Sequence, residues 1–553
     1  MAWSGSVASA GAGRMRWWGW GDPGHARELP RGAMRHLTAA LGRLGRPSPP
    51  VALDAVRLPA GALAAAALER LVRIVGDGNV RADHAERVAH AAGRGYPDLM
   101  RLRGGEPEGA PDAVVLPESH EQVRALLEHC AGESLAVVPF GGGTSVVGGV
   151  APLRGAHAGV IALDMRRICD VVQLDRESLT VTVGGGTRAL ALEGYLSARG
   201  LTLGHFPQSF EYVSLGGCAA TRSAGQASSG YGSIEKMVVG IRLAAPTGDI
   251  ALPAIPASAA GPSLRGVLVG SEGVLGVIDE LSLRVRPAPR ASHYEGVFFE
   301  GFEAGVQALR ALAQEHAMPD VARLSDEAET RMTLALAGAR SVKDRAGRAY
   351  LRARGYGRGC LAILGFEGGE PEAAQRRARA MALVQRGGGL PVGGAPGAAW
   401  RRSRFEAPYL RDELMTLGVM VETLETATQW SNLLRLHGRV GAAIAAALRA
   451  CGTPGLVMCH VSHLYETGAS LYFTFLAARR AEDELGQWHA AKRAASEAIM
   501  QGGGTITHHH AIGRDHAPWM QDEVGAGGVD ALRALKAQLD PAGIMNPGKL
   551  LDA

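Results

Sequence analysis

The chain has 553 residues, a net charge of +4, 20% charged residues and 46% hydrophobic residues, a composition typical of a soluble globular protein with two or three domains. The small net charge, with no basic stripe of interleaved aromatic residues, predicts no nucleic-acid partner. The six cysteines form no C-x-x-C pair, and no apolar run approaches the roughly 20 residues of a membrane span. We therefore expect a cytoplasmic protein.

The N-terminal region, residues 1–106, is predicted to be mainly helical. It contains the unusual motif Trp17-Trp18-Gly19-Trp20-Gly21, and Met15 just before it is an alternative start of translation. From residue 107 the pattern changes to short buried strands and amphipathic helices. The helix expected from Ser119 to Cys130 has its cap at Ser119 or His120. Strands are expected at 111–117, 134–138, 159–163, 179–183 and 237–245, so residues 107–290 form an α/β domain.

A second α+β domain is predicted for residues 291–500, after the Pro287 to Arg290 boundary. The Gly/Pro-rich stretch 387–397 is expected to be a connection within this domain. A final segment, residues 501–553, carries a run of three histidines.

Four loops of small residues follow strands, at 139–145, 208–214, 221–225 and 272–278. The first contains three glycines, Gly141 to Gly143, which let backbone N–H groups form a concave site for a pyrophosphate. One such loop could equally be a surface turn. Four of them indicate a large ligand bound along backbone amides, although no G-x-G-x-x-G or Gly-Lys-Ser/Thr pattern occurs there.

These loops resemble the vanillyl-alcohol-oxidase-type flavoprotein superfamily. Within it, further motifs resemble the alkyldihydroxyacetonephosphate synthase family, FAD enzymes of ether-lipid synthesis; they lie at 205–207, 211–217, 221–225, 231–235, 323–326, 409–412, 422–426, 471–473 and 508–510. The resemblance implies a mixed α/β (α+β) fold. A two-subdomain FAD-binding domain at 107–290 would carry an antiparallel-sheet cap domain at 291–500, with 501–553 completing the active site.

The resemblance also implies FAD contacts from all four loops. Because the first loop reads Gly143-Thr144-Ser145, with no histidine to anchor the flavin, the FAD is expected to be non-covalent. The expected contacts are Pro139, Phe140, Gly141, Gly142, Gly143, Thr144, Ser145, Gln208, Ser209, Phe210, Glu211, Tyr212, Val213, Ser214, Thr221, Arg222, Ser223, Ala224, Glu272, Gly273, Val274, Leu275, Gly276, Val277 and Ile278.

Tyr472 lies in the apolar strand pattern 470–475, where a tyrosine is most often a core residue. The resemblance instead implies that Tyr472 is the acid/base that faces the flavin. A neighbouring cation or strong hydrogen-bond donor would have to lower its pKa for chemistry near neutral pH.

Two arginines, Arg411 and Arg323, match arginines that serve the active site of the family. A guanidinium fork suits a phosphate or carboxylate, although Arg411 also has Asp412 as a local partner. His508, His509 and His510 are predicted to contact substrate, since adjacent residues on an extended segment point to opposite faces and rarely bind one metal ion. We expect no metal. His205 matches a family histidine near the flavin.

The implied activity replaces the acyl group of acyl-dihydroxyacetone phosphate by a fatty alcohol, so the partners are a phosphorylated lipid and an alcohol. Peripheral membrane contact and a homodimer are compatible with it. Departures from the family leave an FAD-linked D-2-hydroxyacid dehydrogenase or oxidase as the alternative. His460 stands where the family has arginine, Ser214 and Gln208 replace threonine and aspartate, and the ending 546–549 resembles the dehydrogenases.

Overall fold

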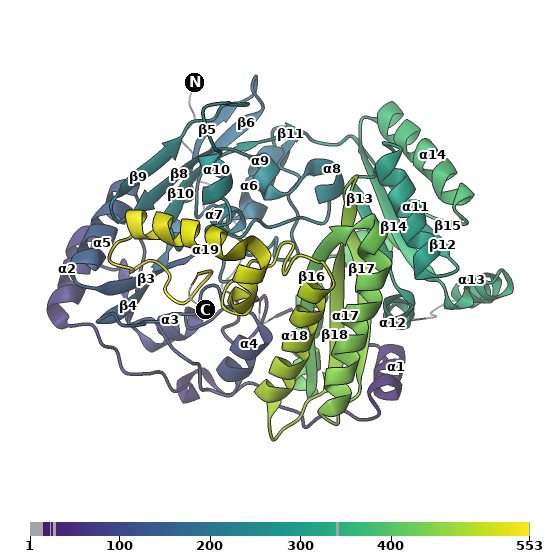
Figure 1. Ribbon diagram of the computed structural model, residues 1–553, viewed down its shortest axis with the longest axis horizontal. Coiled ribbons are helices and arrows are strands. Elements are labelled where there is room, and N and C mark those ends of the chain that lie inside the picture. Colours follow the sequence, from purple (N-terminus) through teal and green to yellow (C-terminus); the bar gives the residue numbers. More distant parts are fainter. Residues whose placement is uncertain (1–14, 23, 26–28, 339–341, 552–553) are drawn as a thin grey trace.

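The computed structural model describes residues 15–22, 24–25, 29–338 and 342–551, so everything before the alternative start Met15 lies outside the described residues. Figure 1 shows two halves, one built on smaller sheets from the first part of the chain and one built on a large sheet covered by helices. The C-terminal helix α19 (Met520–Leu539) returns to lie over the first half. The predicted mixed fold with an antiparallel cap sheet is confirmed.

The first subdomain is built around a four-stranded sheet in the order β1-β2-β4-β3. Three of its strands are parallel and buried on both faces, whereas β1 pairs antiparallel with β2 and comes from the region predicted to be helical. Helix α5 begins where predicted, because the Ser119 hydroxyl accepts a hydrogen bond from the Gln122 N–H. The elements of this part of the chain are α1 (Arg31–Leu41), which packs against the cap, η1 (Leu53–Ala55), α2 (Ala65–Val75), β1 (Val80–Arg81), α3 (His84–Ala89), α4 (Tyr96–Arg103), β2 (Ala113–Val115), α5 (His120–Gly132), β3 (Leu135–Phe140), β4 (Gly159–Asp164) and η2 (Met165–Arg167).

The second subdomain is a five-stranded antiparallel sheet in the order β5-β6-β10-β8-β9, beside a small β11-β7 pair. Short helices and the loops at 208–214 and 221–225 pack against it. Its elements are β5 (Val171–Asp175), β6 (Thr180–Gly184), α6 (Ala189–Ser197), β7 (Leu201–Thr202), α7 (Leu215–Ala220), α8 (Ser228–Tyr231), α9 (Ile234–Met237), β8 (Val238–Ala245), β9 (Gly248–Leu252), α10 (Leu264–Leu268), β10 (Val277–Arg284) and β11 (Arg286–Pro287). The domain boundaries at 106, 290 and 500 stay predictions.

The cap is a seven-stranded antiparallel sheet in the order β15-β12-β14-β13-β17-β18-β16, with long helices across one face, as Figure 1 shows for α17 and α18. Its elements are β12 (Ala291–Phe299), α11 (Phe302–Gln314), β13 (Val321–Ser325), α12 (Glu327–Ala337), α13 (Val342–Ala353), η3 (Tyr356–Arg358), β14 (Cys360–Gly368), α14 (Glu370–Arg386), β15 (Leu390–Gly393), α15 (Ala395–Ser403), α16 (Ala407–Thr416), β16 (Val419–Gln429), α17 (Trp430–Ala450), β17 (Gly455–Leu464), β18 (Gly468–Ala478) and α18 (Glu484–Gln501).

The stretch 387–397, predicted to be a connection, contains the edge strand β15 and the start of α15. That prediction was wrong, because a four-residue edge strand among glycines and a proline has no alternating pattern to reveal it.

Strand β18 shows how the cap positions the site. Its residues alternate between the two faces of the sheet. Leu471, Phe473 and Phe475 are fully buried in the core under the helices, whereas Tyr472 and Thr474 point to the opposite face and line a cavity. The predicted strand is confirmed, and its period of two places the tyrosine on the functional face.

The C-terminal segment, with η4 (Ala517–Trp519), ties the parts together. Met545 forms a parallel bridge to Val137 of β3, directly before the glycine loop. The Asn546 amide donates to the carbonyls of Gly149 and Glu272, and the buried Lys549 ammonium donates to the carbonyl of Ala151. These buried hydrogen bonds fix the backbone around the loop.

Candidate active site

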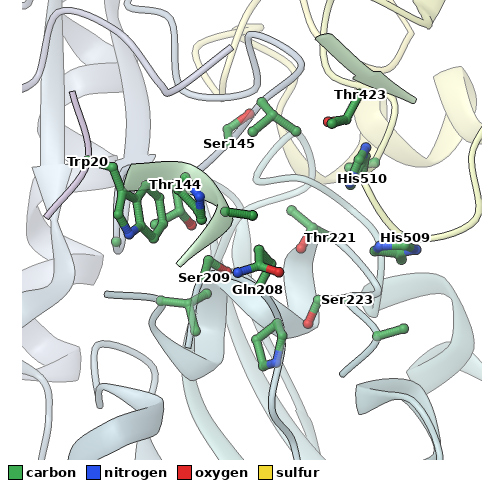
Figure 2. Close-up of a pocket in the computed structure, with 18 of the residues that line it drawn as sticks. Trp20, Thr144, Ser145, Gln208, Ser209, Thr221, Ser223, Thr423, His509 and His510 are labelled. Atoms are coloured by element: carbon green, nitrogen blue, oxygen red, sulfur yellow. The ribbon is translucent and has the colours of Figure 1, made fainter. Parts of the chain in front are cut away.

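A cavity of about 490 Å³ lies where the subdomain loops meet the free face of the cap sheet. In Figure 2, Thr144 and Trp20 mark one end, His509 and His510 the other, and Thr221 lies between them. The predicted cofactor residues that line the cavity are Pro139, Phe140, Gly141, Gly142, Gly143, Thr144, Ser145, Gln208, Ser209, Val213, Ser214, Thr221, Ser223, Ala224, Glu272, Gly273, Gly276, Val277 and Ile278.

Six other predicted cofactor residues do not line the cavity: Phe210, Glu211, Tyr212, Arg222, Val274 and Leu275. Phe210 stacks on Phe405, with ring centroids 5.4 Å apart. Val274 and Leu275 are core residues of the second subdomain. Arg222 donates to the carbonyls of Val269 and Gly266. Their side chains therefore support the loops, and contact with a cofactor from them stays a prediction.

The cavity has the donors that a dinucleotide requires. None of the described residues accepts a hydrogen bond from the backbone N–H groups of Gly142 to Ser145, and the side-chain nitrogen of Gln208 is buried without a partner. A Cβ on Gly141 would overlap the Ser214 hydroxyl, so the glycines keep the floor of the loop open. These unused donors fit the pyrophosphate and polar edges of FAD.

Glu272 holds two walls of the cavity together. Its carboxylate oxygens accept from the N–H groups of Ile512 and Gly513, at 2.8 and 2.7 Å. Burial raises the pKa of Glu272 to about 7. Through these two hydrogen bonds, the loop at 272–278 holds in place the segment that follows the histidine run.

Tyr472 lies in a cluster of rings at the reactive end. His460 stacks on it at 4.8 Å between centroids, and His509 and His510 lie at 6.0 and 5.4 Å. Burial raises the pKa of Tyr472 to about 12, with the neighbouring Thr423 acting in the opposite direction. The phenol therefore keeps its proton at neutral pH.

Arg323 places a positive charge beside His460. Its guanidinium donates to His460 Nε2 at 3.0 Å and forms an ion pair with Glu329 of α12. His460 Nδ1 also lies 3.0 Å from Glu329. Burial opposes ionisation of Glu329, but Arg323 and His460 outweigh it and lower the pKa of Glu329 to about 2. The cation thus reaches the site from β13.

The histidine run is organised by Glu425 of β16. The carboxylate accepts from the backbone N–H groups of His508, His509 and His510, at 2.5, 2.9 and 2.7 Å. Burial opposes its ionisation, but the neighbouring histidine rings and these N–H groups hold the pKa of Glu425 well below its usual range. Burial lowers the pKa of His509 to about 3, so this ring is neutral at pH 7.

The segment of the histidines is bent, so the extended geometry expected from the sequence is wrong. His509 and His510 line the cavity, whereas His508 lies behind them with Nε2 2.5 Å from the Tyr465 hydroxyl. Ring nitrogens of His463, His508 and His509 come within 4.8 Å of one another. The expectation that the site holds no metal stays a prediction.

Sequence reasoning missed His463. A register shift in the β17–β18 ladder between Val461 and Leu464 breaks the alternation, so both His460 and His463 reach the cavity. Sequence reasoning also assigned no role to Glu425, although Glu425 lies in the motif 422–426. A buried carboxylate on the same face as Tyr472 is the signal that could have identified it.

Arg411 of α16 lines the cavity between the loops and the cap. One guanidinium nitrogen donates to the Arg94 carbonyl at 2.8 Å, and two donate to Asp412 at 3.3 and 3.2 Å. An arginine has five N–H donors, so two remain for a ligand. Both the predicted local partner and a binding role fit this geometry.

His205 is buried behind the lining. Its Nε2 lies 2.8 Å from the hydroxyl of Ser223, which lines the cavity, and its Nδ1 has no partner in the described part of the chain. Burial lowers the pKa of His205 to about 4. A catalytic role for His205 stays a prediction, and the geometry gives it contact with the cavity through Ser223.

One arm of the cavity is apolar. Helices α1, α12 and α16 face strands β16, β17 and β18 there, and they bury one cluster of large side chains. Its cavity-lining members are Leu37, Met332, Leu414, Val421, Met458 and Leu476. A cavity with one polar and one apolar end suits an amphiphile.

Two family models match the chain, "FAD linked oxidases, C-terminal domain" at residues 288–550 and "FAD binding domain" at 111–251. The alkyldihydroxyacetonephosphate synthase of Trypanosoma brucei brucei is 32% identical over 97% of this chain and 92% of its own length. That of Dictyostelium discoideum is 33% identical over 85% of this chain and 78% of its own length. This chain belongs to the alkyldihydroxyacetonephosphate synthase family.

Solved structures agree. An alkyldihydroxyacetonephosphate synthase superposes with a TM-score of 0.85 and 28% identity, covering 97% of this chain and 98% of that one. A p-cresol methylhydroxylase with substrate bound has a TM-score of 0.64 at 15% identity, over 88% of this chain and 96% of that one, which shows the shared fold. The predicted family, fold and FAD cofactor are thus confirmed, whereas the non-covalent state of the FAD stays a prediction.

Proposed function

We propose that this protein exchanges the acyl group of acyl-dihydroxyacetone phosphate for a fatty alcohol. The observation that carries the proposal is a single cavity that joins the FAD loops, the Tyr472 cluster and an apolar arm. The names of the family relatives support the same substrates. In this exchange the bond between the substrate carbon and the acyl oxygen breaks, a carboxylate leaves, and the alcohol oxygen takes its place as the alcohol loses its proton.

Different parts of the cavity would bind different parts of the substrates. Arg411, with two guanidinium donors free, would bind the phosphate of the substrate, and the arm around Met332 and Leu476 would hold the alkyl chain. The bound flavin supplies an electrophilic ring. Held between these two contacts, the substrate carbon would lie beside Tyr472.

Proton transfer would begin at Tyr472. Because burial keeps the phenol protonated, Tyr472 can accept a proton from the substrate only after giving up its own. The ring of His509 or His510, whose centroids lie 6.0 and 5.4 Å from that of Tyr472, would take this proton, and the carboxylate of Glu425 would stabilise the histidinium that forms. Arg323 beside His460 favours the phenolate on the other face.

The ending 546–549, which resembles the hydroxyacid dehydrogenases, bears no relation to the substrate in this geometry. Asn546 and Lys549 bind backbone carbonyls around the glycine loop, so they support cofactor binding in either reaction. The alkyldihydroxyacetonephosphate synthase relatives support acyl exchange more than the dehydrogenase alternative.

The test is incubation with acyl-dihydroxyacetone phosphate and labelled hexadecanol, followed by lipid analysis. We expect label in an ether lipid, free fatty acid in equal amount, and no net change in the flavin spectrum. Anaerobic bleaching of the flavin by a 2-hydroxy acid, without ether formation, would establish the dehydrogenase instead.

The expected partners and cellular location stay predictions. Within the described part of the chain, no helix combines the length and apolar character that a membrane crossing requires. Peripheral membrane contact, a homodimer and a cytoplasmic location remain proposals that sedimentation with vesicles, light scattering and fractionation can test.

A further inference from the structure

The motif Trp17-Trp18-Gly19-Trp20-Gly21 has no role in the account so far, yet it forms part of the cavity. Trp20 is 3% exposed and lines the cavity, and its buried indole Nε1 has no acceptor among the residues that the structure describes. In Figure 2 the indole lies at the Thr144 end, away from His509 and His510. A buried indole N–H normally has a hydrogen-bond partner. An unpartnered one on a residue that lines a cavity indicates that a bound ligand supplies the acceptor atom.

The two glycines explain how the segment reaches this place. A Cβ on Gly19 would overlap the carboxylate of Asp412, and a Cβ on Gly21 would overlap the ring of Tyr409. Gly21 also has a φ of +73°, which favours glycine. The segment can therefore pack closely against α16, where the backbone N–H of Trp20 donates to the Asp412 carboxylate at 2.5 Å.

The segment is held as a closed loop. The Arg16 N–H donates to the Gly21 carbonyl at 2.9 Å, and the Arg16 carbonyl accepts from Arg94 at 3.1 Å. The Arg94 carbonyl in turn accepts from Arg411. The Trp20 ring meets Tyr212 edge-on at 5.5 Å, and the Tyr212 carbonyl lies against Gly142. The indole is thus fixed between the glycine loop and the arginine of the site.

The geometry points to Trp20 as a ligand-binding residue whose indole N–H donates to a phosphate oxygen in the cavity. Two sources supply this chemistry: the pyrophosphate of FAD at the glycine loop, and the phosphate of the substrate near Arg411. The second source rests on the proposed function, whereas the first does not. In both, the N-terminal motif closes the cavity over a phosphate.

The test compares Trp20→Phe with wild type in two binding measurements without turnover. Equilibrium dialysis of the holoenzyme gives the FAD dissociation constant, and titration with dihydroxyacetone phosphate gives that of the phosphate probe. One of the two constants should rise about 10-fold or more, the loss expected when a charged group loses a hydrogen bond. A rise for FAD identifies the pyrophosphate, and a rise for the probe identifies the substrate phosphate.

Trp18→Phe is the matched control, because the Trp18 ring lies over Arg16 and Arg103 at 5.0 and 5.1 Å and does not line the cavity. It should leave both constants unchanged. If Trp20→Phe does not fold, Gly21→Ala is used instead. It displaces the indole without removing it and should raise the dissociation constant of FAD or that of the phosphate probe. Unchanged constants in the folded variant overturn the proposal. Absence of ether formation by wild type would overturn the proposed function while leaving an effect on FAD intact.

Discussion

Tyr472 is the residue on which the proposed chemistry depends. Tyr472→Phe keeps the ring against His460 and removes only the hydroxyl, so fold and FAD content should be preserved. A positioned acid/base contributes about 10²–10⁴-fold in rate. We expect ether formation, and exchange of the substrate hydrogen with deuterated solvent, to fall by that factor. Solvent exchange and FAD content should be measured on the same preparation; normal exchange by the variant would return Tyr472 to the core.

Arg411 is expected to discriminate between substrate and cofactor. Arg411→Ala removes the two donors that remain for a ligand, which costs about 2–4 kcal/mol in binding of a phosphate. The dissociation constant of the phosphorylated substrate should rise far more than that of FAD. Arg401→Ala, at a residue that lies over Tyr294 outside the cavity lining, is the control. Equal losses for substrate and FAD would indicate a structural role.

Among the elements, the segment after the histidines contains a partly buried acid, Asp515, whose effect on stability depends on pH. Burial raises the pKa of Asp515 to about 7, with Lys492 acting in the opposite direction. An aspartate in an unfolded chain has a pKa of about 3.9. The folded protein therefore binds a proton at Asp515 that the unfolded chain has lost, and this makes stability fall as pH rises from about 4 to about 7.

Asp515→Asn should remove this contribution. The thermal unfolding midpoint of the variant holoenzyme minus that of the wild-type holoenzyme should be larger at pH 8 than at pH 5. Asp530→Asn, at an exposed aspartate of α19, controls for a general effect of the lost charge. The same difference between variant and wild type at both pH values would contradict the raised pKa.

Elements with a strong local pattern could be predicted from the sequence, and those set by distant contacts could not. The apolar pattern predicted strand β18, although only the family resemblance placed Tyr472 at the site, and the Ser119 cap predicted the start of α5. His463 was missed because a ladder irregularity cancels the alternation. The place of Trp20 depends on its contact with Asp412, 392 residues away, which no local pattern encodes.

At the scale of the whole molecule, the cavity is shared by parts that are far apart in the sequence. The glycine loop and the loop at 272–278 supply its polar end, the cap sheet its reactive face, and α1, α12 and α16 its apolar arm. The C-terminal segment fastens the loops through Asn546 and Glu272. Chain-length preference should therefore respond to the apolar arm alone, independently of the residues that bind phosphate and flavin.

Met332→Trp tests this separation. Met332 lies on α12 in the apolar arm, and a larger ring there takes space from the end of a long chain. Each methylene that loses its place costs about 0.8 kcal/mol. Excluding two or three should lower kcat/KM for hexadecanol about 15- to 60-fold, while octanol, which needs less of the arm, keeps its value. Arg331→Trp places the same ring on the exposed side of α12 and should change neither alcohol. An equal loss for both alcohols would show that the arm holds something other than the alkyl chain, because a chain lying in it must sense the new ring according to its own length.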